Sequence, residues 1–543
     1  MRRRLIPALA ALAGLAASAG PAGAQAVETG EGVVTPLPAG ALNGVAVLDA
    51  DGGTLRAGPR LVEVAPDGAV SFPGADPAFD PRTAVDARAY AIEARGRTVV
   101  VGLGFSDVTS DADRPPQTAA GFAVSTDGGR SYAYRFAPLD ESRDSTVTYG
   151  VSALRAFPVT VPALAAPLDL ALTAGADTLY SANQFAGLRR STDGGATWAP
   201  VVTPPDTLLV LDPREAYDFP YTPDLRQPLG FVDGDRERPL FPSASTNFVA
   251  YSVLVDEAGT VWAGMGGGLN RSVRLPGADD PAWLRYVDLP VGGAIPGNLV
   301  FALEARPRDG RDHVWAACWA PEGAGGEQEF GVAVWRGDDA DGAPVFETVL
   351  LGVRVYDLAF DDLRAYAASD DGLYVSDDDG ATWRAVRTFR AADGRPLPLD
   401  GPATRAVATT PGAVWVGTPG GLLRSTDGAR TWELFRADVA PAAAGEGDRP
   451  VAVYAYPNPY NPRRDGRLRV RLDLDAPASV TVRIFDVGMN LVRTLEAPGR
   501  PAGPNEVAWD GQSDGGLRVA NGAYVYTVDA GGQTLSGRIL VIQ

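Results

Sequence analysis

The chain has 543 residues and a net charge of −19, with one cysteine and one histidine. The excess of acidic groups argues against a nucleic-acid partner and against an anionic membrane surface, because both attract clustered cations. The lone Cys318 and His313 exclude an intrachain disulfide, a thiolate zinc site and an HExxH motif, and we expect no metal and no cofactor. The 64 glycines, 45 prolines and 45% hydrophobic residues predict an all-β fold with many turns.

The N-terminal segment predicts export. Arg2–Arg4 precede an apolar stretch, Leu5–Ala19, and the small residues Ala22–Ala24. This order of charge, apolar stretch and cleavage site is that of a secretory signal peptide, which we assign to residues 1–24. No later stretch approaches the roughly 20 apolar residues of a spanning helix. The sequence therefore predicts a protein that is secreted or held at the outer cell surface, with no transmembrane segment after signal removal.

The pattern Ser-x-Asp-x-Gly-x-x-aromatic recurs four times, as STDGGRSY, STDGGATW, SDDDGATW and STDGARTW. The aspartate can accept backbone N–H bonds within its own turn, the glycine supplies a positive φ, and the aromatic ring buries a large apolar surface at the start of the next strand. We therefore predict hairpin turns with a structural role. The residues with this role are Ser125, Asp127, Gly129, Ser191, Asp193, Gly195, Trp198, Ser376, Asp378, Gly380, Trp383, Ser425, Asp427 and Trp432.

This repeat resembles the Asp-box, or bacterial neuraminidase, repeat family. Strand-like segments surround each copy, so that one unit has four strands and successive units are about 60 residues apart. The resemblance and the period predict a β-propeller of six to seven four-stranded blades over residues 25–436. Six blades lie between about residues 86 and 435. Residues 27–82 are expected to supply a seventh blade or a strand that closes the ring.

Four long insertions interrupt the predicted blades, at Phe105–Ala120, Leu139–Pro167, Thr203–Thr246 and Ala320–Glu329. In an antiparallel meander they fall on the face opposite the Asp-box turns, and long loops on a rigid scaffold commonly bind ligands. We therefore expect a face for an extracellular glycan or protein ligand there. The alternative is that its aromatic side chains only pack the loops onto the blades. The candidate residues are Tyr217, Phe219, Tyr221, Trp319, Glu322 and Glu327.

The pattern changes after the last repeat. Residues 437–450 are rich in alanine, proline and glycine and predict a linker. Residues 451–543 alternate polar and apolar positions between short turns, as in a β-sandwich of about seven strands. The segments VRIFDVGMNLVRTL and NGAY resemble the immunoglobulin-like domain of flagellar hook-capping proteins. This resemblance implies a sorting or attachment domain of the type IX secretion kind, with the secretion machinery as its partner.

Two classes of function remain open. The first is a non-catalytic binding or structural scaffold for a glycan or a protein, as in the Asp-box propellers that resemble photosystem assembly factors. The second is a secreted glycoside hydrolase of the sialidase-like or xyloglucanase-like propeller type. The arginine motif expected of sialidases is missing, because the nearest string, Tyr134–Pro138, follows a repeat instead of preceding one. We favour the scaffold and assign no catalytic residue.

Overall fold

The computed structural model describes residues 34–36, 48–51, 54–58, 62–64, 70–71, 88–436 and 453–542, except 107–116, 163–164, 223–245, 289–293, 321–327, 363, 398, 400, 457, 459 and 463–466. The predicted signal peptide and linker, and the candidates Glu322 and Glu327, lie outside these residues. The chain divides into two compact units. One is formed mainly by Ala46–Val386 and Ala403–Val416, and the other mainly by Arg387–Pro402 and Gly417–Gln543.

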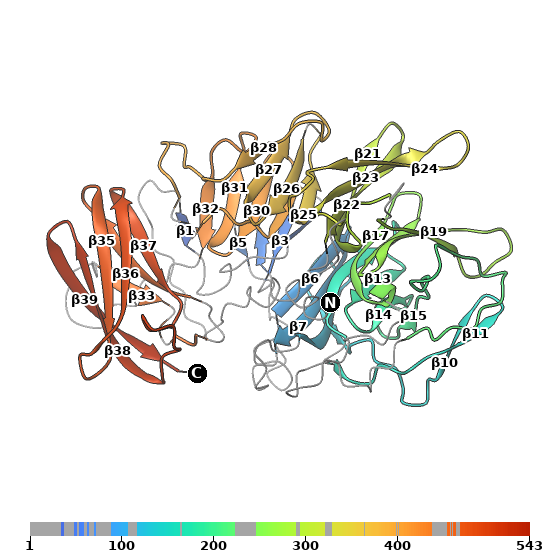
Figure 1. Cartoon of the computed structure of the whole chain (residues 1–543), viewed down its shortest axis with the longest axis horizontal. Coiled ribbons are helices and arrows are strands. Elements are labelled where there is room, and N and C mark those ends of the chain that lie inside the picture. Colours follow the sequence, from blue (N-terminus) through green and yellow to red (C-terminus); the bar gives the residue numbers. More distant parts are fainter. Residues whose placement is uncertain are drawn as a thin grey trace. The chain divides into compact units, whose positions relative to one another are not determined.

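Seven antiparallel sheets of four consecutive strands follow one another along the chain (Figure 1). The strands of the first three are β2 (Leu48–Asp51), β3 (Thr54–Ala57), β4 (Val62–Val64) and β5 (Val70–Ser71); β6 (Arg88–Arg95), β7 (Thr98–Ser106), β8 (Gln117–Ser125) and β9 (Ala133–Arg135); and β12 (Pro167–Leu172), β13 (Leu179–Asn183), β14 (Gly187–Ser191) and β15 (Ala199–Pro200).

The next two sheets consist of β17 (Ala250–Val255), β18 (Val261–Met265), β19 (Gly268–Val273) and β20 (Ala282–Tyr286), and of β21 (Leu299–Arg308), β22 (Arg311–Trp319), β23 (Gly331–Asp338) and β24 (Pro344–Val349). The last two consist of β25 (Val355–Phe360), β26 (Ala365–Ser369), β27 (Gly372–Ser376) and β28 (Arg384–Val386), and of β29 (Ala406–Thr410), β30 (Ala413–Thr418), β31 (Gly421–Ser425) and β32 (Glu433–Arg436).

The first strands of these sheets form a closed circle. Along the chain, β6 neighbours β12, β12 neighbours β17, β17 neighbours β21, β21 neighbours β25 and β25 neighbours β29. Strand β2 closes the circle because it contacts both β6 and β29. The all-β propeller fold predicted from the sequence is therefore confirmed, and the part of the chain that the structure describes forms seven blades. The segment before residue 82 supplies the first blade, β2–β5.

Two blades carry an additional edge strand. β16 (Val210–Leu211) pairs with β20 at the edge of the fourth blade. β1 (Val34–Pro36) pairs in parallel with β32 of the seventh blade. A hairpin of β10 (Thr146–Tyr149) and β11 (Ser152–Arg155) lies between the second and third blades in the chain, and the 3-10 helix η2 (Thr246–Phe248) precedes the fourth.

Large apolar side chains fill the space between adjacent blades. Trp262 of the fourth blade is fully buried, and its ring centroid lies 4.9 Å from that of Trp335 in the fifth. Trp315 of the fifth blade is also fully buried and lies 5.1 Å from Phe360 of the sixth. Because each indole buries on the order of 200 Å², such contacts provide much of the stability of the ring.

The C-terminal part forms a seven-stranded sandwich, as predicted. One sheet has the order β33–β34–β37 and the other the order β36–β35–β38–β39. Their core contains the fully buried rings of Tyr460 and Trp509. Within the described residues, no helix is long and apolar enough to cross a bilayer. The strands are β33 (Val453–Tyr456), β34 (Leu468–Leu474), β35 (Ala478–Phe485), β36 (Leu491–Arg500), β37 (Gly503–Trp509), β38 (Gly522–Ala530) and β39 (Gln533–Val541).

Candidate functional site

The four repeated turns share one set of hydrogen bonds. In the turn from Ser191, the serine Oγ donates to Asp193 Oδ1 at 2.8 Å and accepts the N–H of Gly195 at 2.8 Å. Asp193 accepts the N–H and the hydroxyl of Thr197 at 2.9 and 2.6 Å. These bonds, first that of the Thr197 hydroxyl, lower the pKa of Asp193 to about 2. The aspartate is therefore an ionised acceptor that closes its own turn.

The same bonds recur in the other three turns, with Asp127, Asp378 and Asp427 as acceptors. The hydroxyl that the aspartate accepts comes from Ser131, Thr197, Thr382 or Thr431. This hydroxyl is not among the residues predicted from the sequence, although all four copies have Ser or Thr directly before the aromatic residue. The recurrence of a hydroxyl at this position in all four copies was the signal that could have identified it.

The aromatic residue of each tryptophan-containing turn packs on a neighbouring ring. Trp198 lies 4.9 Å from Phe122, which belongs to the second blade. Trp383 meets Trp315 of the fifth blade edge to face at 6.3 Å. Trp432 is buried and packs edge to face on Phe389 at 5.2 Å. These turns therefore hold aromatic contacts in place as well as connecting strands.

The four described candidates for the ligand face lie in two separate clusters. Trp319 is only 2% exposed; its ring stacks on Phe301 at 4.1 Å and its Nε1 donates to Val355 O at 2.6 Å. Tyr221 is 4% exposed. Tyr217 and Phe219 are partly buried in the same apolar cluster as Tyr221, which does not include Trp319. Most of the area of these rings is therefore packed against the fold.

Two of the predicted insertions pack on each other. In the first, the hydroxyl of Tyr149 donates to the carbonyls of Leu211 and Pro281 at 3.0 and 2.8 Å. Tyr221 N–H, in the second insertion, donates to Arg155 O at 2.8 Å. Exposed apolar side chains of this layer are Leu139, Val151, Val161, Leu209 and Val210.

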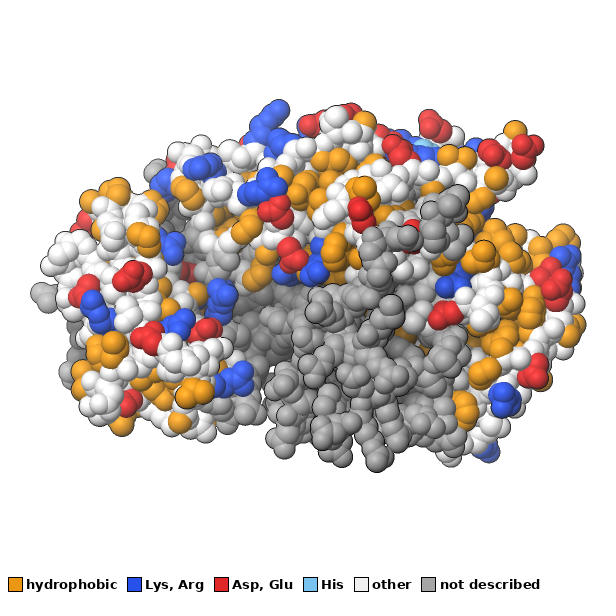
Figure 2. Space-filling view, in the orientation of Figure 1, with side chains coloured by type: hydrophobic (Ala, Val, Ile, Leu, Met, Phe, Trp, Pro, Cys, Tyr) orange, Lys and Arg blue, Asp and Glu red, His pale blue; other side chains and the backbone are white. Residues whose placement is uncertain are grey.

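Figure 2 shows hydrophobic side chains gathered on the side of the view where Figure 1 places β10 and β11. Acidic and basic side chains are interspersed over the described surface on this face. The two insertions therefore form an accessory layer with apolar and polar surface next to the third and fourth blades.

A pocket of about 420 Å³ opens where this layer meets the third blade. Its walls come from the segment after β9, from the β10–β11 hairpin, from β14, β15 and the turn between them, and from Tyr221 and Thr222 of the second insertion. Of the residues predicted for a ligand face, Tyr221 lines it, together with Trp198 of the second repeated turn. The lining residues are Phe136, Ala137, Pro138, Leu139, Asp140, Glu141, Asp144, Thr146, Val147, Ala156, Arg189, Ala196, Thr197, Trp198, Pro200, Tyr221 and Thr222.

A buried ion pair forms one wall of the pocket. Arg189 is 1% exposed, and both of its terminal nitrogens donate to Asp140, Nη2 to Oδ2 at 3.0 Å. Arg189 Nε donates to Ala186 O at 2.8 Å, and Asp140 Oδ2 also accepts the N–H of Val159 at 2.8 Å. A buried guanidinium needs such a counter-charge, and here the two-pronged contact neutralises it. Three N–H groups of Arg189 thus bond within the protein, and Asp140 balances its charge.

The mouth of the pocket, in contrast, is lined by exposed side chains. The side chain of Glu141 is 66% exposed and pairs with the exposed Arg143. Phe136 is 81% exposed. Asp144 accepts the N–H of Glu141 at 2.9 Å. The mouth therefore presents an apolar ring beside carboxylates, and such a combination is common in small-molecule sites of 300–1,000 Å³.

Sequence reasoning missed Arg189. In the strands equivalent to β14, its position is filled by Asn270, Tyr374 or Leu423. A charged residue at an inward-facing strand position requires a partner of opposite charge. An arginine at a position where these other strands have an uncharged residue was therefore a usable signal. The partner Asp140 lies 49 residues earlier in the chain, and local pattern does not reveal such a pairing.

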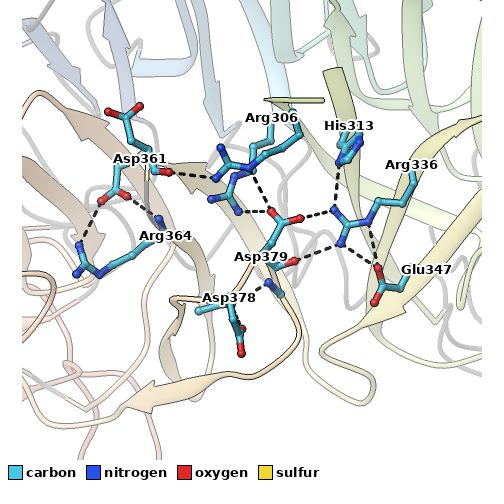
Figure 3. A network of polar contacts seen from close by, with 12 residues as sticks. Arg306, His313, Arg336, Glu347, Asp361, Arg364, Asp378 and Asp379 are labelled. Atoms are coloured by element: carbon cyan, nitrogen blue, oxygen red, sulfur yellow. Dashed lines mark hydrogen bonds and ion pairs between the residues drawn. The ribbon is translucent and has the colours of Figure 1, made fainter. Parts of the chain in front are cut away.

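A second polar network connects the fifth and sixth blades (Figure 3). Asp379, in the third repeated turn, accepts Arg306 Nη1 at 2.6 Å and Arg336 Nη1 at 2.7 Å. Arg336 Nη2 donates to Glu347 at 2.9 Å, and Arg336 Nη1 lies 3.1 Å from His313 Nδ1. Burial, and then the Arg336 charge, lower the pKa of His313. The histidine is therefore neutral at pH 7 and accepts a bond from the guanidinium.

Among the described residues, no group of three or more His, Cys, Asp or Glu side chains is placed to hold a metal ion. Cys318 is buried in β22, and burial raises the pKa of its thiol to about 12. A thiol that remains protonated at neutral pH is a weak nucleophile.

Comparisons with solved structures return proteins of low identity. PorZ, described as a surface component of the type-IX secretion system of Porphyromonas gingivalis, is 14% identical, with a TM-score of 0.31 and coverage of 92% of this chain and 66% of PorZ. The chain thus spans slightly less than two thirds of PorZ. YCF48 from Cyanidioschyzon merolae is 17% identical, with a TM-score of 0.39 and coverage of 72% and 96%.

The GH74 xyloglucanase from Xanthomonas campestris is 13% identical, with a TM-score of 0.42 and coverage of 90% of this chain and 64% of the enzyme. No curated protein matches the chain. The model of the FlgD Ig-like domain family matches residues 461–533. The resemblance of the C-terminal sandwich to hook-capping proteins is thereby confirmed.

Proposed function

We propose that this chain is an exported, non-catalytic binding scaffold that acts outside the cell or at its outer surface. In this proposal, residues 1–24 direct export, residues 25–436 form the propeller that binds an extracellular glycan or protein, residues 437–450 are a linker, and residues 451–543 are a sorting or attachment domain. The domain would engage a type IX secretion machinery.

The observation that carries the proposal is the pocket beside the third blade. Two insertions, held by Tyr149 and Arg155 through bonds to distant segments, build it onto a rigid ring. Binding sites are commonly formed by such loops on a rigid scaffold. The C-terminal sandwich, in which residues 461–533 match the FlgD Ig-like domain family, supports the sorting role.

Export and sorting can be tested in a bacterium that has the type IX machinery. The full chain and a version that ends at residue 436 are expressed, and each is measured in the cytoplasm, the periplasm and on the surface. We expect the full chain on the surface or in the medium, and the shortened chain in the periplasm. Equal surface delivery of both chains would refute the sorting role of the C-terminal domain.

A non-catalytic scaffold and a glycoside hydrolase differ in whether the protein cleaves glycans. We expect the purified full chain to leave sialosides, xyloglucan and other β-glucans intact during prolonged incubation. Release of reducing sugar that disappears when an acidic side chain of the pocket is replaced by its amide would establish the hydrolase instead, because glycosidases work through a pair of carboxyl groups.

A further inference from the structure

The pocket beside Arg189 differs from a simple surface depression in its chemistry. Its mouth combines the 81%-exposed ring of Phe136 and the apolar side chain of Leu139 with the exposed carboxylate of Glu141. Isolated exposed apolar groups are ordinary, but here they line the opening of a cavity of about 420 Å³. A ligand for this opening must present apolar surface and hydrogen-bond donors together.

The charge of the lining disfavours anionic ligands. Three carboxylates line the pocket, and Arg189 is the one cation among its lining residues. The guanidinium of Arg189 is occupied by both oxygens of Asp140 and by a backbone carbonyl. A sulfate, uronate or sialate group would therefore meet carboxylates without gaining a free arginine. Ligand hydroxyls, in contrast, can donate to carboxylates.

From this chemistry we propose that the pocket binds an uncharged oligosaccharide, with the apolar face of a sugar ring on Phe136 and hydroxyls donating to Glu141. This inference rests on the proposed binding function and names its ligand class. The volume lies within the range of small-molecule sites, and stacking on an exposed aromatic ring adds affinity without requiring charge. The assignment also separates this site from one that acts on sialic acid, which is anionic.

The test measures binding of the full chain to neutral oligosaccharides, such as β-glucan and xyloglucan fragments, and to the anionic sialyllactose and oligogalacturonate, by calorimetry. We expect binding to at least one neutral fragment and none to the anionic sugars. Phe136→Ala should weaken the binding roughly ten-fold, because the ring contributes its apolar contact. Glu141→Gln should weaken it several-fold through the loss of a charged acceptor.

Leu351→Ala is the matched control, since Leu351 is a 60%-exposed apolar residue outside the pocket lining. It should bind as the unmodified chain does. Failure to bind any neutral sugar, or equal binding by Phe136→Ala, would overturn the inference. If an anionic glycan or a basic peptide bound instead and Phe136→Ala weakened it, the binding scaffold would stand and the ligand class would be wrong. Surface delivery, measured separately, is unaffected by either result.

Discussion

Asp357 in the first strand of the sixth blade accepts the N–H of Val407 in the first strand of the seventh at 2.8 Å. The same bond joins two other pairs of blades: Asp169 accepts Val253 N–H at 2.9 Å, and Glu93 accepts Leu172 N–H at 3.0 Å. These carboxylates thus connect the innermost strands of successive blades around the axis of the propeller.

The carboxylates near the axis also affect one another. Burial raises the pKa of Asp169 and of Asp357 to about 7, against the opposing effect of their backbone bonds. Burial likewise raises the pKa of Glu93 and Glu304, and neighbouring carboxylates add to this. Other charged groups affect the pKa values of these carboxylates and of the neighbouring Asp49. They are Asp49, Asp51, Arg56, Asp169, Glu304, Asp312 and Asp357.

From the raised pKa values of these carboxylates we expect the propeller to be more stable at pH 5 than at pH 8. Because the folded-state pKa of Asp357 lies above its unfolded value of 3.8, the folded chain binds more protons between about pH 4 and 7. The free energy of unfolding therefore falls as pH rises through this window, by on the order of 1–3 kcal/mol for Asp357. Thermal unfolding of the full chain at both pH values measures the difference.

Asp357→Asn isolates one of these groups. The amide keeps an acceptor for one backbone N–H but does not titrate, so the pH dependence of the melting temperature should become shallower than in the unmodified chain. Asp218→Asn, at an exposed position, is the control for the change of a carboxylate to an amide. A slope equal to that of the unmodified chain in Asp357→Asn would contradict the assignment.

The propeller could be predicted because its signal is local and repeated. Each turn brings its own acceptor, as Asp193 and Thr197 do, and the period places the blades without knowledge of any long-range contact. The fourth and fifth blades lie between two such turns, so the period places them. The first blade, which begins at Leu48, lies before the first turn, and this is why the sequence left the choice between six and seven blades. Ring closure by β2 depends on contacts with β29 at the far end of the repeat.

The pocket could not be predicted because its contacts are non-local. Arg189 lies in β14 of the third blade, whereas Asp140 lies in the first of the two insertions. The two insertions meet through Tyr149 and Leu211, which are 62 residues apart in the chain. Trp319 ends a strand, and its position alone did not reveal that its indole turns inward to bond Val355. Sequence pattern thus located the loops but not which of their side chains remain accessible.

Asp379 should stabilise the contact between the fifth and sixth blades. It occupies a turn position that is glycine in the other three copies, at Gly128, Gly194 and Gly428, and it has a positive φ of 58°. Asp379→Asn should lower the free energy of unfolding by about 1–3 kcal/mol, because it leaves Arg306, which is 2% exposed, without its counter-charge.

Asp377, two positions earlier, provides the comparison for Asp379. Its side chain is 66% exposed and pairs with Arg364 at 2.6 Å. An exposed pair contributes at most about 1 kcal/mol, so Asp377→Asn should have the smaller effect. Urea unfolding of both variants measures the two free energies. Equal losses would show that the carboxylate of Asp379 has no special role between the blades.

The hydroxyl of Tyr149 should hold the accessory layer in place. Tyr149→Phe removes the bonds to Leu211 O and Pro281 O and leaves buried carbonyls without this donor, which should cost about 1–2 kcal/mol. Hydrogen exchange of the β10–β11 amides should become faster, while exchange in the C-terminal sandwich, which has its own core, should not change. Unchanged protection of the hairpin would mean that other contacts hold the layer.

Ala429 is the position where a substitution should stabilise the chain. It is buried and has φ of 63°, whereas the equivalent Gly195 has φ of 81°. A side chain in the left-handed region costs about 1–2 kcal/mol, and glycine returns part of this through its larger unfolded-state entropy. Ala429→Gly should therefore raise the free energy of unfolding by about 0.5–1 kcal/mol. Gly195→Ala should lower it, although the added methyl would lie 3.5 Å or more from its neighbours. Denaturant titration of both variants measures the two changes in the free energy of unfolding. These changes should have opposite signs, because both turns have room for a methyl group and only the backbone strain differs.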